Sequence, residues 1–259
     1  MYPSNIRKKL STNNVILGTS MFSREPHVAQ IIYNAGPDFV WIDQEHSPWG
    51  SESIGTICVQ GRSSDVAPIV RVQWNDPGEI KKAYDTGAVG VMVPQVDNPE
   101  EALDAVKFSK YPPQGERGIA PFFASFMGLS PEEILANSND ETLLVLQMES
   151  KEAYEKIDDI LAVDGFEVLC VGPTDLSASI GVPGKIHHPK VENIMIDVAQ
   201  KIKSTKKHLL TTFSDPEVSR KWIKEGYTMM NISSPLDLGI PGMKKIFKEL
   251  REEFNQEHY

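Results

Sequence analysis

The sequence has few cysteines, and no cluster of cysteines and histidines has the spacing of zinc ligands. Cys58 and Cys170 are the two cysteines among 259 residues. Cys170 lies in the apolar run FEVLCVG and Cys58 in a predicted helix, which is typical of small core residues in a reducing compartment. The sequence therefore indicates neither a disulfide framework nor a thiol redox centre.

Positive charge and long apolar runs are also scarce. The formal net charge is −10 and the pI is near 5.1, whereas a nucleic-acid-binding surface needs a concentrated basic stripe. No stretch reaches the roughly 18 apolar residues of a membrane span, and no apolar segment follows the basic N-terminus as in a signal peptide. With 40% hydrophobic and 24% charged residues, the composition is that of a globular protein. We expect a cytoplasmic enzyme without a nucleic-acid or membrane partner.

Short apolar segments alternate with segments of helical periodicity along the whole chain, a pattern that predicts βα units and a parallel sheet. The predicted strands cover 15–20, 39–43, 68–72, 90–94, 142–149, 166–171, 208–213 and 227–232. The predicted helices cover 26–35, 50–61, 77–86, 98–109, 151–161, 191–205, 215–225 and 240–254. Eight strands without a linker favour a single (β/α)8 TIM barrel over residues 1–259, with a doubly wound sheet as the alternative.

Residues 111–141 form a connection longer than an ordinary loop. The segment contains YPPQGERG, the aromatic stretch PFFASFMG and a short predicted helix that begins at Ser130. We predict that it covers the active site or contacts another subunit.

Polar side chains follow several of the predicted strands, at the end of a barrel where catalytic residues gather. Six of them are ionisable and come from four strands: Asp43, Glu45, His46, Arg71, Glu149 and Asp175. Gln95 and Gln147 lie at the same level of the predicted barrel. These residues are the candidates for the active site.

Glu149 and Asp175 follow two successive strands, and neighbouring strands lie about 4.8 Å apart. Two carboxylates at one point repel each other unless a cation lies between them, and oxygen ligands suit Mg²⁺ or Mn²⁺. The pair is therefore a candidate metal site. The alternative is that each carboxylate caps a helix or joins a structural ion pair.

Arg71 and His46 are the candidates for substrate binding and proton transfer. Arg71 lies in the apolar strand PIVRV, so its charge needs an anionic partner, either a substrate carboxylate held in a bidentate manner or an internal acid. His46 follows two acids that could orient its ring, although a lone histidine is often structural. The backbone N–H groups of Gly172-Pro173-Thr174-Asp175 could hold an anionic oxygen, or the segment could be an ordinary loop.

None of the predicted strands carries a lysine at its C-terminal end, which a Schiff-base aldolase would need. Lys206 and Lys207 precede a strand, and Lys151 and Lys185 lie in or beyond loops. The sequence thus favours a mechanism in which a metal, and not an iminium, stabilises the intermediate.

Several segments, in order and at compatible spacing, resemble the HpcH/HpaI family of class II pyruvate aldolases, which includes 2,4-dihydroxyhept-2-ene-1,7-dioate and 2-keto-3-deoxy-sugar-acid aldolases. The resemblance runs from about residue 15 to 230. It is carried by FVWIDQEH, PIVRVQWND, IKKAYDTGAVGVMVPQV, KYPPQGERG, VLQMES and VGPTDLSASIG. The resemblance implies a barrel of the phosphoenolpyruvate/pyruvate-binding type and a homo-hexamer built as a trimer of dimers.

The resemblance also implies roles for single residues. Glu149 and Asp175 would hold Mg²⁺, Mn²⁺ or Co²⁺, with Gln147 nearby, and Arg71 would help to bind a 2-oxo acid. His46 would move protons and be oriented by Asp43. Asp85 would reach the site of a neighbouring subunit.

The expected reaction is reversible cleavage of a 4-hydroxy-2-oxo acid to pyruvate, or a related 2-oxo acid, and an aldehyde. A citrate-lyase-type CoA-ester lyase and an oxaloacetate decarboxylase are alternatives on the same barrel, and a barrel without activity is a third. Two departures concern the acceptor side of the site. The segment at 119–128 is apolar and aromatic where the family has a second arginine, and Ser233-Ser234 stand where an acid is frequent.

Overall fold

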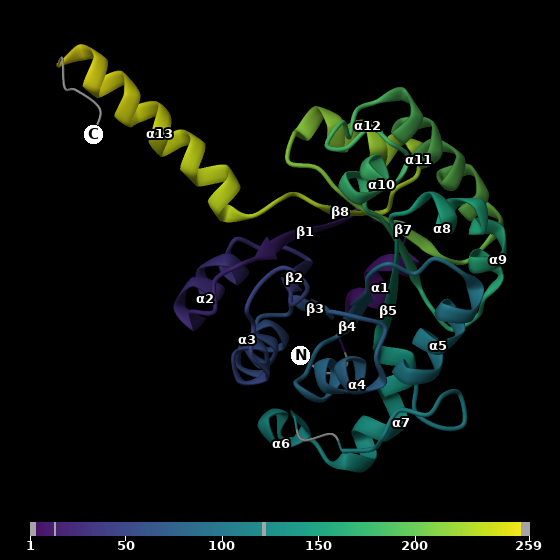
Figure 1. Cartoon of the computed structure of the whole chain (residues 1–259). Coiled ribbons are helices and arrows are strands. Elements are labelled where there is room, and N and C mark those ends of the chain that lie inside the picture. The colour runs from purple at the N-terminus through teal and green to yellow at the C-terminus, as the bar shows by residue number, and fades with distance from the viewer. Residues whose placement is uncertain (1–3, 13, 121–122, 255–259) are drawn as a thin grey trace.

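The computed structural model describes residues 4–12, 14–120 and 123–254 and shows a closed barrel of eight parallel strands in sequential order (Figure 1). The strands are β1 Ile16–Met21, β2 Phe39–Asp43, β3 Ala67–Arg71, β4 Gly90–Val93, β5 Leu143–Met148, β6 Val168–Val171, β7 His208–Thr212 and β8 Met229–Asn231. β8 pairs with β1 and closes the barrel. The predicted (β/α)8 barrel is confirmed, and each predicted strand overlaps the observed one.

Helices surround the barrel. They are α2 Pro26–Asn34, α3 Ser51–Ser63, α4 Pro77–Asp85, α5 Pro99–Ser109, α7 Pro131–Glu141, α8 Lys151–Glu155, α9 Ile157–Ala162, α11 Pro189–Lys201 and α12 Pro216–Glu225. The 3₁₀ turn η1 covers Ile202–Ser204. Several helices begin at a proline that follows a capping side chain, and Asp76, for example, accepts hydrogen bonds from the N–H groups of Gly78 and Glu79.

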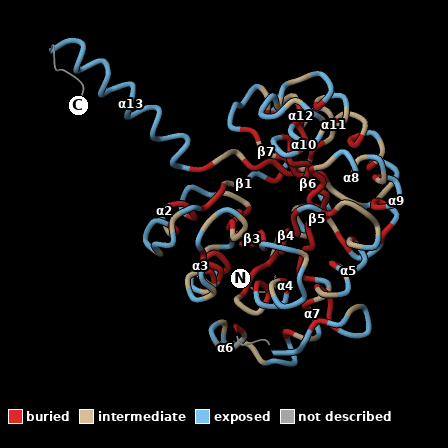
Figure 2. Tube along the Cα trace, in the orientation of Figure 1, coloured by how far each residue is buried: buried red, intermediate tan, exposed pale blue. Residues whose placement is uncertain are grey.

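The core has two layers. Side chains inside the barrel form one cluster, and a larger cluster lies between the strands and the helices. The strands are accordingly the buried centre of the molecule in Figure 2 (Figure 2). Helix α1, Ile6–Ser11, adds Ile6 and Leu10 to the inner cluster. It therefore closes the end of the barrel at which the strands begin.

Several helices differ from the prediction. α1, the short α6 (Phe123–Met127) and α10 (Pro173–Ser179) were not expected, and α13, expected over 240–254, covers Pro235–Glu253. The helix expected over 151–161 is divided at Lys156 into α8 and α9. No helix in the described part of the chain combines the length and the apolar character needed to cross a membrane.

The segment 111–141 contains α6 and α7, and its end lies beside the start of β5. Glu141 at the end of α7 is paired with Arg62 at the end of α3, and Phe123 of α6 lies against the same guanidinium. The described part of this segment therefore packs near the N-terminal end of the barrel and against its outer helices. It does not cover the rim of its own chain, so a subunit contact is the interpretation that we retain as a proposal.

Candidate active site

The strand register brings the predicted site residues to one rim of the barrel. Asp43 is the register partner of Arg71 at the ends of β2 and β3. Met148 is the partner of Val171 at the ends of β5 and β6, so Glu149 emerges beside Gly172. Because all strands are parallel, these ends lie at the same side of the barrel.

Arg71 is held by two carboxylates. Its Nε and Nη2 donate to the two oxygens of Asp43 at 2.9 and 2.6 Å, and its Nη1 lies 2.9 Å from Oε2 of Glu45. The guanidinium carbon lies 4.9 Å from the ring centre of Trp41. Of the five N–H donors of an arginine, three are engaged in these contacts, which leaves two for a ligand.

This geometry corrects the expected partner of Arg71. The bidentate edge formed by Nε and Nη2 faces Asp43, and the internal ion pair considered for Arg71 is the one that the structure has. A substrate carboxylate would have to bind the remaining hydrogens of Nη1 and Nη2. Binding of a 2-oxo acid by Arg71 stays a proposal.

The expected partner of the His46 ring also differs. Asp43 is occupied by Arg71 and accepts from the backbone N–H groups of Glu45 and His46, at 3.1 and 3.4 Å. The ring Nε2 of His46 lies 3.8 Å from Oε2 of Glu45. Asp43 therefore shapes the loop, while Glu45 is the carboxylate beside the ring, and the ring itself is largely exposed to solvent.

Glu149 is a buried carboxylate at the centre of the rim. Its Oε1 accepts from the backbone N–H of Gln95 at 3.0 Å, and its Oε2 accepts from the side-chain amide of Gln147. Burial raises the pKa of Glu149 to about 7, the N–H of Gln95 opposes this rise, and the charges of Asp175 and Glu45 add to it. The charge of Arg71 lowers the pKa of Glu149, although no ion pair of Glu149 occurs among the described residues.

The donor set around Glu149 fits a divalent cation. Oε1 of Gln147 is buried without a hydrogen-bond partner, and Asp175 adds a second, exposed carboxylate. A side chain at Gly172 would lie 2.8 Å from Oε2 of Glu149, so this glycine keeps the space beside the carboxylate open. No cluster of three His, Cys, Asp or Glu residues with metal-binding geometry occurs in the described residues. Two carboxylates suffice for Mg²⁺, which retains water and substrate oxygens as further ligands.

The segment 172–175 offers fewer free N–H groups than expected. The N–H of Gly172 donates to the carbonyl of Met148, and Pro173 has none. Thr174 and Asp175 lie in the first turn of α10, where backbone N–H groups have no partner within the helix. Of the predicted anion-binding residues Gly172, Pro173 and Thr174, only Thr174 therefore offers a backbone N–H to an anion. The N–H of Asp175 lies next to it in the chain.

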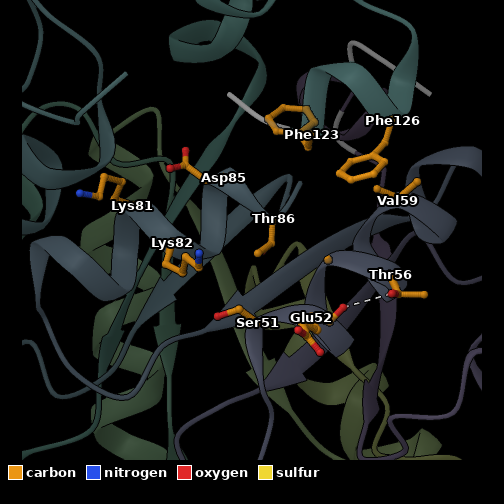
Figure 3. A pocket seen from close by; sticks show the side chains of 11 residues that line it. Ser51, Glu52, Thr56, Val59, Lys81, Lys82, Asp85, Thr86, Phe123 and Phe126 are labelled. Atoms are coloured by element: carbon orange, nitrogen blue, oxygen red, sulfur yellow. Dashed lines mark hydrogen bonds between the residues drawn. The ribbon is translucent and has the colours of Figure 1, made fainter. Parts of the chain in front are cut away.

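Asp85 lies away from this rim. It ends α4 on the outside of the barrel, where Arg117 donates to its Oδ1 at 2.8 Å. Burial raises the pKa of Asp85, and Arg117 opposes the rise. Asp85 lines a cavity of about 710 Å³ between α3, α4 and α6, with the rings of Phe123 and Phe126 along one side of it (Figure 3). This position is compatible with the predicted contact to a neighbouring subunit, which remains a proposal.

Two lysines whose pKa is lowered, the buried Lys110 and the half-buried Lys207, lie at the other end of the barrel. Burial lowers the pKa of Lys110, whose Nζ lies 3.1 Å from Glu167, and of Lys207, which precedes β7. Lys151 begins α8 close to the rim but is exposed and paired with Glu155. Iminium chemistry requires a desolvated lysine at the rim, and none of Lys110, Lys207 and Lys151 meets this requirement.

Glu45 and Gln95, candidates by their positions, make contacts that the sequence did not predict. Glu45 contacts Arg71, lies near His46 and accepts from the Gln95 amide at 3.4 Å, and burial raises its pKa. Gln95 has φ of 52°, an unfavourable backbone conformation for a residue other than glycine, and its N–H binds Glu149. Their positions shortly after β2 and β4 were the feature of the sequence that could have indicated these contacts.

A closed (β/α)8 barrel with acidic, basic and histidine side chains at its C-terminal rim is the architecture of a barrel enzyme. A family model described as HpcH/HpaI aldolase/citrate lyase matches residues 19–240. The chain belongs to this family, as its motifs predicted, and is thus an aldolase-type carbon–carbon lyase. Aldolases of this family are generally metal-dependent.

Individual relatives agree with this assignment. The hydroxypyruvate/pyruvate aldolase of Roseobacter denitrificans is 35% identical over 209 residues, which are 80% of this chain and 82% of that protein. The 4-hydroxy-2-oxo-heptane-1,7-dioate aldolase of Klebsiella pneumoniae is 34% identical over 200 residues, 76% of this chain and 75% of that protein. The crystal structure of an HpcH/HpaI family protein from Burkholderia cenocepacia has a TM-score of 0.89 at 26% identity and covers 96% of this chain and 99% of that chain.

Proposed function

We propose that this protein is a divalent-metal-dependent aldolase that cleaves a 4-hydroxy-2-oxo acid to pyruvate, or a related 2-oxo acid, and an aldehyde. The observation that carries the proposal is the rim itself, where the buried Glu149 and the neighbouring Asp175 lie in the same electrostatic cluster as Arg71. A cation site and a carboxylate-binding group within one cluster suit a 2-oxo acid, which presents a keto oxygen and a carboxylate on adjacent carbons. The names of the two relatives above support the same reaction class.

Glu149 and Asp175 would hold the cation, with the orphaned oxygen of Gln147 beside it. When bound, Mg²⁺, Mn²⁺ or Co²⁺ supplies Lewis-acid stabilisation of the negative charge that develops on the 2-oxo acid. Arg71 would bind the substrate carboxylate through its two remaining N–H groups, and the amide of Thr174 would add a further donor. These contacts fix the orientation of the 2-oxo acid before the bond breaks.

His46 would accept the proton of the C4 hydroxyl. As that proton leaves, the C3–C4 bond breaks, the aldehyde carbonyl forms, and the bonding electron pair passes to the pyruvate enolate. Protonation at C3 then completes pyruvate, and synthesis runs through the same steps in reverse. The exposed ring of His46 would exchange its proton with solvent, and Glu45 lies 3.8 Å from its Nε2.

We further propose that the active unit is an oligomer, a hexamer of three dimers, in which Asp85 reaches the site of a neighbouring copy. The support is its position on the outer face, beside an open cavity and away from its own rim. The aromatic rings of α6 lie beside Asp85, so we expect them to line the acceptor side of such a shared site and to favour aldehydes with apolar substituents.

The test is a screen of 4-hydroxy-2-oxo acids, assayed by pyruvate release in the presence of Mg²⁺, Mn²⁺ or Co²⁺. We expect metal-dependent release of pyruvate and, in the reverse direction, consumption of pyruvate with added aldehydes. Oxaloacetate and a citrate-type CoA thioester serve as comparison substrates. Turnover of the thioester without any turnover of 2-oxo acids would replace the proposal by the CoA-ester lyase.

A further inference from the structure

Three polar side chains meet inside the barrel, on strands from which no residue of the candidate active site comes. The side-chain amide of Asn231 on β8 donates to the hydroxyl of Ser20 on β1 at 2.9 Å and to the hydroxyl of Thr212 on β7 at 3.0 Å. We call Ser20, Thr212 and Asn231 the hydroxyl cluster. Because β7, β8 and β1 are neighbours in the closed barrel, the cluster joins the last strands of the chain to the first.

The hydroxyl cluster lies at the level of the candidate active site. The register partners of Cys170 on β5 and β7 lie two residues before Glu149 and Thr212. Glu149 and Thr212 are therefore in one row around the barrel, with Gly172 between them. Asn231 is the register partner of Thr212 and continues this row. The cluster thus extends the rim from the candidate metal site to β8 and β1.

The side chains of the hydroxyl cluster point into the barrel. Leu210 on β7 and Met229 on β8 belong to the inner apolar cluster. Thr212 and Asn231 each follow two residues later, and side chains alternate between the two faces of a strand, so they also point inward. The hydrogen bond from Asn231 to Ser20 places the Ser20 hydroxyl on the same side. The cluster therefore lies above the apolar filling of the barrel.

The hydroxyl cluster has unused hydrogen-bonding capacity. The hydroxyls of Ser20 and Thr212 accept from Asn231, and neither donates to a protein acceptor within the described ranges. The Oδ1 atom of Asn231 is buried without a donor. A buried polar atom without a partner lowers stability, and apolar side chains like those of the layer below would avoid this cost. The cluster is therefore better explained by a ligand than by packing.

The accessible part of the cluster suits a neutral hydroxyl group. Ser20 is 9% exposed and Thr212 is half-buried, so a ligand in the barrel mouth can reach both hydroxyls. Each of them can donate one hydrogen bond and accept another, which matches the donor and the acceptor of a ligand hydroxyl. A carboxylate fits less well, because no basic side chain is bonded to the cluster in the part of the chain that the structure describes. The carboxylates of Glu149, Asp175 and Glu45 also make the rim acidic.

The position of the cluster selects the carbon atom that carries the ligand hydroxyl. In a closed barrel of eight strands in sequential order, β7 lies across from β3. With the substrate carboxylate at Arg71 on β3 and the keto oxygen towards Glu149, C3 of the 2-oxo acid extends towards β7 and β8. We infer that Ser20 and Thr212 bind a hydroxyl group on C3 of the 2-oxo acid, and that Asn231 positions both side chains. This inference rests on the proposed aldolase function and adds two specificity-determining residues to it.

The preferred substrate is then a 3,4-dihydroxy-2-oxo acid. Its C3–C4 bond breaks, the C4 hydroxyl loses its proton to give the aldehyde, and C3 keeps the electron pair and gains a proton. The C3 hydroxyl is retained throughout, so the second product is a 3-hydroxy-2-oxo acid and no oxidant or reductant is needed. A site that binds a substrate hydroxyl discriminates against the analogue that lacks it.

The first experiment measures this discrimination in the direction of synthesis. Hydroxypyruvate and pyruvate differ only in the C3 hydroxyl, and each is reacted with propanal, which has no hydroxyl, in the presence of the metal that supports turnover. The readout is the ratio of kcat/KM for hydroxypyruvate to that for pyruvate. Thr212→Val removes the hydroxyl and keeps the branched shape, so we expect this ratio to fall about 5- to 10-fold, the share of one neutral hydrogen bond. Ser20→Ala should have an effect of the same size.

Thr211→Val is the matched control. Thr211 precedes Thr212 on β7, is fully buried on the other face of the strand, and donates to the carbonyl of Val171 at 3.0 Å. Its substitution removes one buried hydrogen bond as well, and we expect the ratio to stay within about twofold of the wild type. Asn231→Ala should lower the ratio like Thr212→Val, whereas a purely structural Asn231 would lower the melting temperature and leave the ratio unchanged.

A second arm separates the two fragments of the substrate. Lactaldehyde and propanal differ in one hydroxyl, and each is reacted with pyruvate. If Thr212→Val changes the ratio between these aldehydes and not that between the 2-oxo acids, the cluster binds the aldehyde and the assignment to C3 is wrong.

Titration calorimetry with hydroxypyruvate and pyruvate distinguishes failure of the inference from failure of the proposed function. If aldol turnover is found but neither the kinetic nor the binding preference depends on Thr212, the hydroxyl subsite is refuted and the proposed function stands. If no aldehyde reacts but hydroxypyruvate binds more tightly than pyruvate and Thr212→Val abolishes the difference, the proposed reaction fails and the subsite stands. Absence of binding by both acids would refute the two together.

Discussion

Replacement of Arg71 by lysine tests whether this residue binds substrate or only neutralises the rim. Arg71→Lys keeps the positive charge but replaces a planar fork of five N–H donors with a single ammonium group. In the structure the guanidinium contacts Asp43 and Glu45 at 2.6 to 2.9 Å and is 10% exposed. An ammonium group in this space can satisfy one carboxylate but cannot also offer two parallel donors to a ligand.

The magnitude follows from the hydrogen bonds that the substitution removes. A hydrogen bond between charged groups contributes about 1.5–3 kcal/mol, and Arg71→Lys removes two such bonds to the substrate carboxylate. We expect the activation free energy for a 4-hydroxy-2-oxo acid to rise by about 3 kcal/mol or more, so that kcat/KM falls at least about 100-fold. Asp43 would also lose part of its pairing while remaining buried, so the free energy of unfolding should fall by about 2–3 kcal/mol.

The assay follows pyruvate release at several substrate concentrations and urea unfolding on the same preparations. Arg62→Lys is the matched control, because Arg62 is also a buried arginine paired with a carboxylate, Glu141, but at the other end of the barrel. We expect Arg62→Lys to lower the free energy of unfolding and to leave kcat/KM of the folded protein within about twofold. If Arg71→Lys behaves like Arg62→Lys, Arg71 is a structural residue and the proposed carboxylate contact is wrong.

Four further predictions concern the metal, a buried carboxylate, the class of aldolase and the proton carrier. A chelator should abolish pyruvate release, and Mg²⁺, Mn²⁺ or Co²⁺ should restore it. Glu149→Ala and Asp175→Ala should each abolish metal binding in titration calorimetry while the fold stays intact. Full activity of the chelated enzyme would refute the metal-dependent mechanism. In metal-free protein the pKa of Glu149 is raised to about 7, so its contribution to stability is complete below about pH 4.5 and lost as the pH rises through 7. Urea unfolding should show a loss of up to about 3 kcal/mol between these limits, absent from Glu149→Gln, and an equal pH dependence in the variant would contradict the assignment. Borohydride with pyruvate should add no mass in intact-protein mass spectrometry, and an adduct on Lys151 or Lys185 would show iminium chemistry. His46→Ala should bind metal and pyruvate normally but turn over about 10²–10⁴-fold more slowly, and lost metal binding would make His46 a ligand instead.

The barrel was predictable because its determinants are local and repeated. Each strand is a short apolar segment buried on both faces, and prolines after capping residues mark where helices such as α4 begin. The helices that the sequence did not predict depend on contacts distant in the chain. α1 has six residues, too few to be stable alone, and is held because Ile6 and Leu10 fill the end of the barrel.

The early start of α13 has a different cause. Gly239, Pro241 and Gly242 disfavour a helix interior, so the sequence indicates a start near residue 240. Ser234 nevertheless caps a helix that begins at Pro235, and its side chain accepts from the N–H of Asp237. The cap and the hydrogen bond from the Ser233 hydroxyl to Asp237 outweigh the unfavourable residues that follow. Helix propensities alone do not include these side-chain bonds.

The candidate site shows where prediction from a sequence ends. Strand ends determine which residues reach the rim, and the structure places Asp43, Glu45, His46, Arg71, Glu149 and Asp175 there together. Which carboxylate pairs with which base depends on register and side-chain direction. Asp43 is the last residue of β2 and is in register with Arg71, so its oxygens accept from the guanidinium and not from the histidine ring. Glu45 lies two residues beyond the end of β2 and contacts both His46 and Arg71. The spacing in DQEH allowed either acid to orient His46, and the register of two adjacent strands decides between them.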